Sequence, residues 1–434
     1  MGDRFRPEEQ TRALGLATLA FTVCFAVWTI FSIIGVKIKT DLGLSDTEFG
    51  LLVATPVLTG SVSRIFLGVW TEQYGGRIVF PLQMVLTAVA VWLLTTVDTY
   101  PLFLLAALGL GLAGGSFIVG VSYVSRWFES KSQGTALGIF GVGNVGAAIT
   151  NFAAPFLVVA FGWEVTAQVY AGVLLLTAAG FYLLAKTDPV EAERKRTGRR
   201  IIRASAQLEP LKYIQVWRFS MYYFFVFGGF VALASFLPRY YTGAYGLELT
   251  TAGVLAGLYS LPGSVFRALG GWMSDRWGAR FVMYLTFIVS LVCLFVMSYP
   301  KTSYSVSGVH GPITFEIGIS LGAFVVLSAI LGFVMSLGKA AVYKHVPVYY
   351  PNHVGSVGGL VGMIGGLGGF VLPIMFGVLL DVTGIWTVPF MLLFAIVGVS
   401  TVWMHVAIRL MELRRHPVLA EERYLSDVPE EPHP

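Results

Sequence analysis

The chain has 434 residues, of which 56% are hydrophobic, 12% are charged and 50 are glycine. This composition excludes an ordinary soluble globular protein. The formal net charge of +5 does not indicate nucleic-acid binding, because the basic residues gather in loops on one side of the helices predicted below.

Apolar runs of about 20 or more residues follow one another along the chain, and each is long enough to cross a bilayer as a helix. We therefore predict an all-α membrane protein with twelve transmembrane helices. The first run is too long for a signal-peptide core and lacks a cleavage site, so we expect it to remain a membrane span. The two cysteines, Cys24 and Cys293, lie in apolar runs and are expected to pack there. The predicted helices are 13–36, 48–70, 78–97, 101–125, 133–160, 163–186, 213–238, 249–273, 280–299, 313–341, 354–380 and 385–408.

The distribution of basic residues predicts the orientation. The longest loop, 187–212, is rich in arginine and lysine, and the positive-inside rule makes it cytoplasmic. Because six helices precede this linker, the tails 1–12 and 409–434 are expected on the same side. We predict an N-terminal six-helix bundle at 13–186 and a C-terminal one at 213–408. Ser45 is expected to cap the second helix.

A repeat supports two related halves. Gly60–Arg77, GSVSRIFLGVWTEQYGGR, recurs as Gly263–Arg280, GSVFRALGGWMSDRWGAR. Each copy places an arginine inside an apolar run and ends in a charged turn. Such duplication is typical of transporters built from two pseudo-symmetric bundles.

The repeated arginines, Arg64 and Arg267, are the first candidate site residues. A single arginine near a helix end often extends to the interface, but two at matching positions favour a shared buried site. The acids near the predicted helices all fall at helix ends: Glu48, Glu129, Glu164, Glu248, Glu316 and Asp381. A buried charge without a partner is costly, so the missing partner is most simply a transported anion. Planar guanidinium groups suit planar oxyanions.

Two glycine-rich runs supply further candidates. GVGNVGAAITN (Gly141–Asn151) contains Asn144 and Asn151, which share a helix face and can donate to an anion. The second run, GGLVGMIGGLGGFVLP (Gly358–Pro373), echoes the first. Close helix packing is the commoner use of such glycines. Aromatic ring edges also suit a weakly hydrated anion. The candidates are Phe117, Tyr223 and Tyr343, although a single aromatic in a membrane helix is more often a packing residue than a ligand.

Lys339 lies near the inner end of the tenth helix and is the candidate for proton coupling. Beside two arginines it could lose and regain a proton within the physiological range. The alternative is a lysine that extends to the interface. His345 is the other candidate, and we expect it in the cytoplasmic loop.

The two charged turns are assigned to gating rather than to substrate binding. Their acid–base spacing can lock neighbouring helix ends, and the gating residues are Glu72, Arg77, Asp275 and Arg280. The sequence has no HExxH, Walker A or zinc-ligand pattern, and its glycine clusters lie within membrane spans. We therefore expect neither an enzyme nor a bound cofactor.

The charged turns resemble the loop motif of the major facilitator superfamily, more closely at Gly271–Arg280 than in the first half, where Glu72 and Gln73 replace the usual acid and base. The two glycine runs resemble the nitrate signatures of its nitrate/nitrite porter (NarK-type) family. The resemblance covers the whole transmembrane region. It implies nitrate bound between Arg64 and Arg267. The further contacts that it implies are Phe117, Tyr223, Gly141, Asn144, Gly365 and, by a weaker correspondence, Tyr343.

We expect a secondary transporter that moves nitrate, and also nitrite, across the cytoplasmic membrane by alternating access, with the major facilitator fold. Its expected partners are these anions, membrane lipid and protons, and it is expected to act as a monomer. The favoured coupling is nitrate/proton symport, and nitrate/nitrite antiport is the alternative. Another small-anion porter, taking formate or oxalate, and a membrane-embedded anion sensor remain open.

Overall fold

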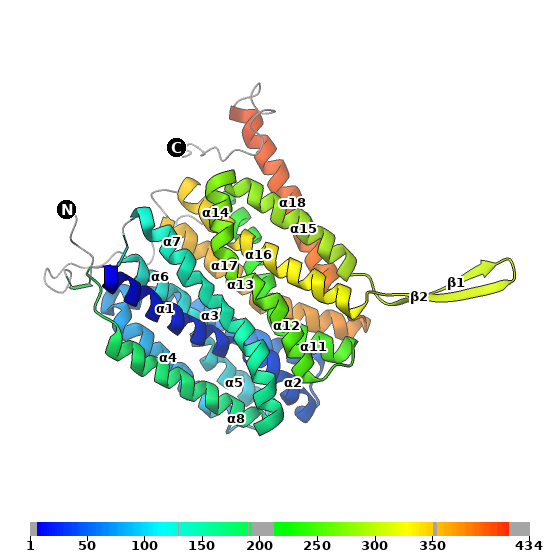
Figure 1. The fold of residues 1–434 in the computed structure, drawn as a ribbon, viewed down its shortest axis with the longest axis horizontal. Coiled ribbons are helices and arrows are strands. Elements are labelled where there is room, and N and C mark those ends of the chain that lie inside the picture. The colour runs from blue at the N-terminus through cyan, green and yellow to red at the C-terminus, as the bar shows by residue number, and fades with distance from the viewer. Residues whose placement is uncertain (1–6, 129, 190, 193–211, 350–353, 416–434) are drawn as a thin grey trace.

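The computed structural model describes residues 7–128, 130–189, 191–192, 212–349 and 354–415. It is a bundle of membrane-length helices with one β-hairpin standing clear of it (Figure 1). The first half comprises α1 (Pro7–Trp28), α2 (Phe31–Leu42), α3 (Asp46–Tyr74), α4 (Gly76–Leu94), α5 (Tyr100–Leu110), η1 (Gly111–Gly115), α6 (Ser116–Ser125), α7 (Ser130–Gly141), η2 (Val142–Val145) and α8 (Gly146–Leu184). The second comprises α10 (Ile214–Tyr223), η4 (Phe224–Gly229), α11 (Phe230–Ala244), α12 (Leu249–Ser260), α13 (Pro262–Val265), α14 (Arg267–Trp277), α15 (Ala279–Met297), β1 (Thr302–Gly308), β2 (Gly311–Ile317), α16 (Leu321–Tyr349), α17 (Val354–Thr383) and α18 (Val388–Arg415).

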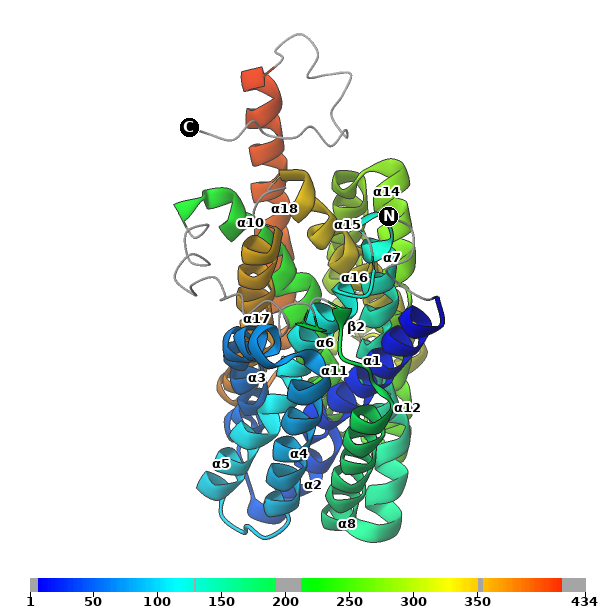
Figure 2. The same ribbon diagram turned by 90° about the vertical axis from the view of Figure 1, so that its left-hand side faces the viewer.

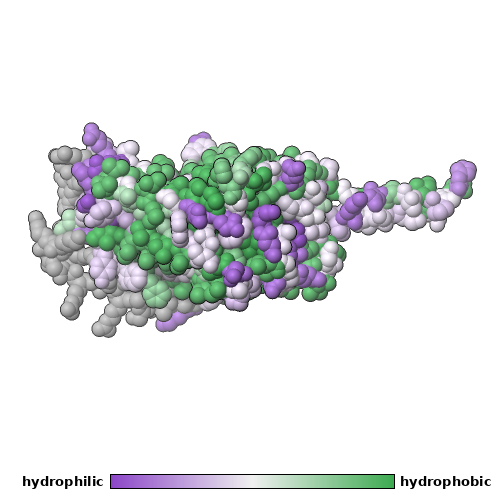
Figure 3. Space-filling model, turned by 90° about the horizontal axis from the view of Figure 1, so that it is seen from below, coloured by the Kyte–Doolittle hydropathy of each residue, from purple (hydrophilic) through white to green (hydrophobic). Residues whose placement is uncertain are grey.

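The described residues accommodate all twelve predicted runs. Ten helical stretches are long and apolar enough to cross a membrane. One of them, Ala136–Leu184, reverses at Gly162, where φ is 85°, and so contains two of the predicted helices. Helix α3, with 29 residues, is a further long helix. Hydrophobic side chains cover wide areas of the helical body, as expected for a surface facing lipid (Figure 3).

Several predicted boundaries are wrong. The helices predicted to end at 36, 238 and 341 continue to Leu42, Ala244 and Tyr349. The run 313–341 begins too early, because Gly311–Ile317 pairs with Thr302–Gly308 as an antiparallel hairpin and the helix starts only at Leu321. Ser alternates with Thr, Tyr and Val in Thr302–Gly308, and Gly311–Ile317 contains Ile, Thr and Phe, which favour a strand. Helix α1 already begins at Pro7 and α18 continues to Arg415, so part of each expected tail is helical. Most of the predicted linker, 193–211, lies outside the described residues.

The repeat seen in the sequence is also a structural repeat. Gly75 ends α3 with φ 79° and ψ 149°, and Gly278 ends α14 with φ 86° and ψ 141°. A residue with a side chain rarely adopts a positive φ of this kind. The matching glycines therefore make the same sharp turn at the end of each charged motif.

The two halves meet along long helix pairs. Helix α3 packs along α17, α8 packs against α12, and α2 packs against α11 (Figures 1 and 2). Glycines bring the α3 and α17 backbones together, since a Cβ added at Gly50 would lie 2.3 Å from the carbonyl oxygen of Pro373. This contact places the middle of α3, which carries Arg64, against the glycine-rich part of α17.

Helices around the centre are interrupted. The 3₁₀ segments η1 and η2 break two long helices in the first half, and the π-helical segment η4 lies between α10 and α11. Helices α13 and α14 are separated at Phe266, directly before Arg267. Such interruptions inside membrane helices commonly occur where a helix lines a functional site.

Candidate functional site

Arg64 lies in the interior of α3 and is 8% exposed. Its Nη1 donates to the carbonyl oxygen of Gly362 in α17, at 2.9 Å. Its Nε has no hydrogen-bond partner within the described part of the chain. An arginine of the first half therefore reaches the glycine-rich segment of the second half with donor capacity left over.

Arg267 makes the reciprocal contact. It is 7% exposed at the start of α14, and a Cβ added at Gly141 would lie 3.2 Å from its Cδ and 3.4 Å from its Cζ. Its Nη1 also lacks a partner among the described residues. Each arginine therefore lies against the glycine signature of the opposite half.

One aromatic ring connects the two arginines. The Cζ atoms of Arg64 and Arg267 each lie 5.7 Å from the centre of the Phe117 ring. Phe227 is 5.6 Å from Arg64, and Tyr343 is 5.8 Å from Arg267. Cation–π contacts of this kind offset part of the cost of removing a guanidinium group from water. The sequence did not single out Phe227, because it is one of several aromatic residues in its helix.

Tyr223 completes this aromatic wall. It stacks on Phe227 with ring centres 5.0 Å apart and meets Tyr343 edge to face, also at 5.0 Å. The Tyr343 hydroxyl donates to the Gly358 carbonyl oxygen at 3.2 Å. A Cβ added at Gly365 would lie 2.3 Å from Tyr223 Cδ1, so that glycine makes room for the tyrosine. The predicted aromatic residues thus lie together with the arginines.

The two candidate asparagines have different surroundings. Asn144 is fully buried in η2, and within the described residues neither its amide nitrogen nor its amide oxygen has a partner. Asn151 accepts from Ser32 at 3.1 Å and donates to Ser260 at 3.1 Å and to the Ala234 carbonyl at 3.3 Å. Asn144 therefore has an amide available to a ligand, whereas Asn151 connects α8 to α2, α11 and α12.

Among the described residues, no carboxylate pairs with the positive charge at the centre. In the described ranges, neither Arg64 nor Arg267 takes part in an ion pair with an acid. Ion pairs in those ranges join other residues, among them Lys39–Asp46, Arg239–Asp46, Arg126–Asp188, Lys186–Glu9 and Lys301–Glu316. Two buried like charges are unfavourable without a counter-charge, so this arrangement is suited to receiving an anion.

Lys339 is fully buried in α16. Its ammonium donates to the Gly263 carbonyl oxygen and lies 3.5 Å from the centre of the Phe230 ring. It therefore contacts α13, one turn before Arg267. The prediction that His345 lies in a loop is wrong: α16 continues through it to Tyr349, and its buried ring stacks on Phe219 at 5.2 Å.

The predicted inner gating residues are only partly described. Arg77 lies 5.6 Å from the Tyr182 ring centre, and its Nη2 is 3.5 Å from the Tyr182 carbonyl oxygen. Arg280 is 2% exposed, whereas Arg77 is partly exposed, so the arginines that end the two copies of the repeat differ in burial. Glu72 and Asp275 lie in α3 and α14, but their side chains are outside the described residues. The gating assignment stays a prediction.

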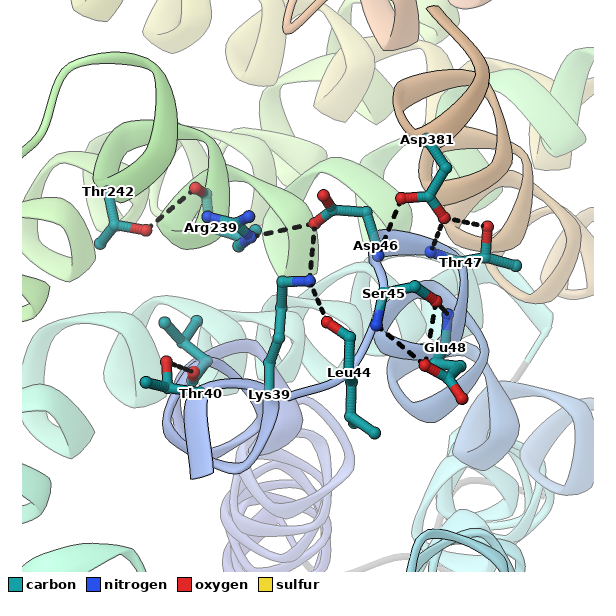
Figure 4. Close-up of polar contacts among 11 residues, drawn as sticks. Lys39, Thr40, Leu44, Ser45, Asp46, Thr47, Glu48, Arg239, Thr242 and Asp381 are labelled. Atoms are coloured by element: carbon teal, nitrogen blue, oxygen red, sulfur yellow. Dashed lines mark hydrogen bonds and ion pairs between the residues drawn. The ribbon is translucent and has the colours of Figure 1, made fainter. Parts of the chain in front are cut away.

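A polar network that the sequence did not predict closes the opposite end, which we call the outer end (Figure 4). Asp46 Oδ1 lies 3.3 Å from Lys39 Nζ and 3.1 Å from Arg239 Nε. Asp381 accepts from the backbone nitrogens of Asp46, at 3.1 Å, and Thr47, at 2.7 Å. The predicted Ser45 cap is confirmed, as part of a capping box with Glu48.

The duplicated helical halves, with buried cations between them and an end that is closed by contacts across the halves, define a membrane transporter of the two-bundle class. The family model of the Major Facilitator Superfamily matches residues 16–323. A bacterial homologue of the human lysosomal transporter Spinster, solved in an inward-facing and occupied conformation, has a TM-score of 0.67. The match covers 96% of this chain and 86% of that one at 15% identity, which shows the fold alone.

Curated relatives narrow the family. The "Probable nitrate/nitrite antiporter NarK1" of Thermus thermophilus is 41% identical over 94% of this chain and 93% of its own. The "Probable nitrate/nitrite transporter NarK2" of Mycobacterium tuberculosis is 32% identical over 89% and 93%. The chain belongs to the nitrate/nitrite porter (NarK-type) family of the major facilitator superfamily.

Proposed function

We propose that this protein carries nitrate and nitrite across the cytoplasmic membrane by alternating access, with the anion bound between Arg64 and Arg267. The buried arginine pair beside one phenylalanine, without an adjoining carboxylate in the described residues, is the observation that carries this proposal. The names of the Thermus and Mycobacterium relatives support the choice of anion.

The donor groups fit a small planar oxyanion. Arg64 donates to Gly362 through Nη1. Its Nε and the Nη1 of Arg267 have no hydrogen-bond partner among the described residues and can donate to an anion. Planar guanidinium forks hold oxyanions through parallel hydrogen bonds. Asn144 supplies a further unused amide, and the surrounding aromatic rings suit a weakly hydrated anion.

Two couplings are consistent with this site. In nitrate/proton symport, Lys339 exchanges the proton, which is motivated by its full burial near Arg267. In nitrate/nitrite antiport, the arginine charges require an anion before the halves can move, and the Thermus relative is named an antiporter. Counterflow in proteoliposomes at fixed pH separates the two. If nitrate uptake requires internal nitrite and ignores a pH gradient, symport is wrong.

The proposed orientation has both termini and the linker 187–212 in the cytoplasm, following the positive-inside rule. The bundles 13–186 and 213–408 are the two moving units, and the turns that contain Arg77 and Arg280 form the inner gate. Both arginines come from one chain, which supports function as a monomer.

The decisive experiment measures nitrate binding and nitrate flux for wild type and Arg267→Lys. Lysine keeps the charge but loses the planar fork, so we expect nitrate affinity to fall at least tenfold. Arg276→Lys is the matched control, because Arg276 is exposed on the same helix. Unchanged affinity in Arg267→Lys contradicts the two-arginine site.

The same assay addresses the rival functions. Nitrate binding without flux favours an anion sensor, and preferential binding of formate or oxalate favours a different small-anion porter.

A further inference from the structure

The network at the outer end divides evenly between the halves. Lys39 and Asp46 belong to α2 and α3 of the first half, and Arg239 and Asp381 belong to α11 and α17 of the second (Figure 4). Each half therefore contributes one cation and one anion. The three pairing residues Lys39, Asp46 and Arg239 have side chains only 14% to 18% exposed, so these contacts are partly shielded from water.

Asp381 completes a helix of the other half. The first backbone N–H groups of a helix lack partners inside the helix and attract a carboxylate. In α3, the Ser45 side chain accepts from the nitrogen of Glu48, but the nitrogens of Asp46 and Thr47 donate to Asp381. The Thr47 hydroxyl donates to the same carboxylate. Separation of α3 from α17 would return these donors to water.

Arg239 is held within its own half as well. Its guanidinium lies 4.8 Å from the centre of the Trp386 ring, and α11, which carries it, packs on α17, which carries Asp381. If Asp46 moves away with the first half, Asp381 loses its contact with α3 and remains in the second half together with Arg239. Asp381, an acid of the same half, then becomes available to Arg239.

We propose that these four side chains form an outer latch that exchanges partners during transport. In the closed state, Asp46 holds both Lys39 and Arg239 while Asp381 caps α3. When the outer end opens, Lys39 keeps Asp46 and Arg239 transfers to Asp381. No partly buried charge is then left without a partner, which would be costly for Lys39, Asp46 and Arg239. This inference rests on the alternating access proposed above, and it adds Asp46, Arg239 and Asp381 as positioning residues for that cycle.

If the partners exchange, substitutions of Asp46 and of Arg239 should differ in how far they open the outer end, although the two residues form one ion pair. Asp46→Asn removes the Lys39 contact from both states. It also removes the Arg239 contact with Asp46, which exists only in the closed state, so its net effect is to weaken the closed state. Arg239→Gln removes one ion pair from each state. Asp46→Asn should therefore open the outer end, and Arg239→Gln should leave the balance nearly unchanged. A lock without exchange predicts equal opening by both variants.

The readout is the labelling of a cysteine at position 57 by a membrane-impermeant maleimide added outside right-side-out vesicles. Val57 is buried, and it contacts α17, since a Cβ at Gly369 would lie 3.1 Å from its Cγ1. Val57→Cys is placed in a chain that also carries Cys24→Ala and Cys293→Ala. Labelling needs no nitrate, so its result is independent of whether nitrate is the substrate.

We expect Asp46→Asn to accelerate labelling about fivefold, in line with one partly shielded ion pair, and Arg239→Gln to change it less than twofold. In an Asp381→Asn background the open-state partner is absent, so adding Arg239→Gln should accelerate labelling about fivefold over that background. Unchanged labelling in Asp46→Asn overturns the latch. Equal acceleration by Asp46→Asn and Arg239→Gln overturns the exchange.

Two controls keep these outcomes interpretable. Lys301→Gln breaks an ion pair with Glu316 at the same end but inside one half, and it should leave labelling unchanged. Each variant is checked for a single folded species by size-exclusion chromatography. If Asp46→Asn does not fold, Asp46→Ser takes its place, because serine is also neutral and suits a helix start.

Discussion

The guanidinium of Arg267 lies against Gly141, close enough that a single methyl group on that glycine would be 3.2 to 3.4 Å from three of its side-chain atoms. The reciprocal relationship joins Arg64 to Gly362. The two glycine-rich signatures therefore have a physical role beyond close helix packing. Each provides a wall without side chains for the arginine of the other half, so each arginine forms a contact that depends on how the two halves are positioned.

This relationship predicts the effect of Gly141→Ala. The added methyl group displaces the flexible Arg267 side chain by a few tenths of an ångström, so folding is retained and the substrate site is distorted. We expect the KM for nitrate to rise roughly three- to tenfold, which corresponds to about 0.7–1.4 kcal/mol.

The control for this prediction is Gly138→Ala, one turn earlier in α7, where an added Cβ has no neighbour within 4 Å. A rise in KM of the same size in Gly138→Ala would show that the effect does not act through Arg267.

The two asparagines of the first signature should separate affinity from stability. Asn144 has no hydrogen-bond partner in the described part of the chain, so Asn144→Ala removes no hydrogen bond there and should weaken nitrate binding with little change in Tm. Asn151→Ala removes three hydrogen bonds between helices and should reduce stability by about 1–3 kcal/mol. Thermal unfolding and nitrate binding, measured on both variants, test this. The opposite assignment of effects would make Asn151 the ligand.

Much of the fold and the centre of the site follow from sequence patterns with strong physical constraints. Long apolar runs must be helices in a bilayer, and the repeated Arg64 and Arg267 stand out because charge is rare there. The contacts of these arginines with Gly362 and Gly141 depend on how the halves dock, which no local pattern encodes.

The outer latch was missed for a related reason. Asp46, Arg239 and Asp381 are far apart in the sequence, and each looks like an ordinary charge near a helix end. The hairpin Thr302–Ile317 was missed because its apolar second strand runs almost directly into α16.

Gly365 is predicted to matter for packing around the site. A Cβ there would lie 2.3 Å from Tyr223 Cδ1 and 2.9 Å from its Cβ, so neither side chain nor backbone can accommodate it without movement. We expect Gly365→Ala to destabilise the protein by about 1–3 kcal/mol through overpacking, and to disturb the Tyr223–Tyr343 contact. Gly359→Ala in the same helix has open space around the new methyl group and should be neutral or slightly stabilising. Equal Tm values for the two variants would contradict this explanation.

Lys339→Met tests the coupling directly. Methionine keeps much of the buried volume but removes the ammonium that binds the Gly263 carbonyl and lies over the Phe230 ring. If Lys339 carries the proton, nitrate accumulation driven by a pH gradient should be lost. Nitrate counterflow at equal pH should persist, because exchange requires no net proton movement.

Arg64→Met is the comparison for this variant, since loss of a substrate-binding group should abolish both activities. Accumulation that still follows the pH gradient in Lys339→Met would remove Lys339 from the proton path. Its contact with Gly263 would then serve to hold the chain one turn before Arg267, and the corresponding loss would be in nitrate affinity rather than in coupling.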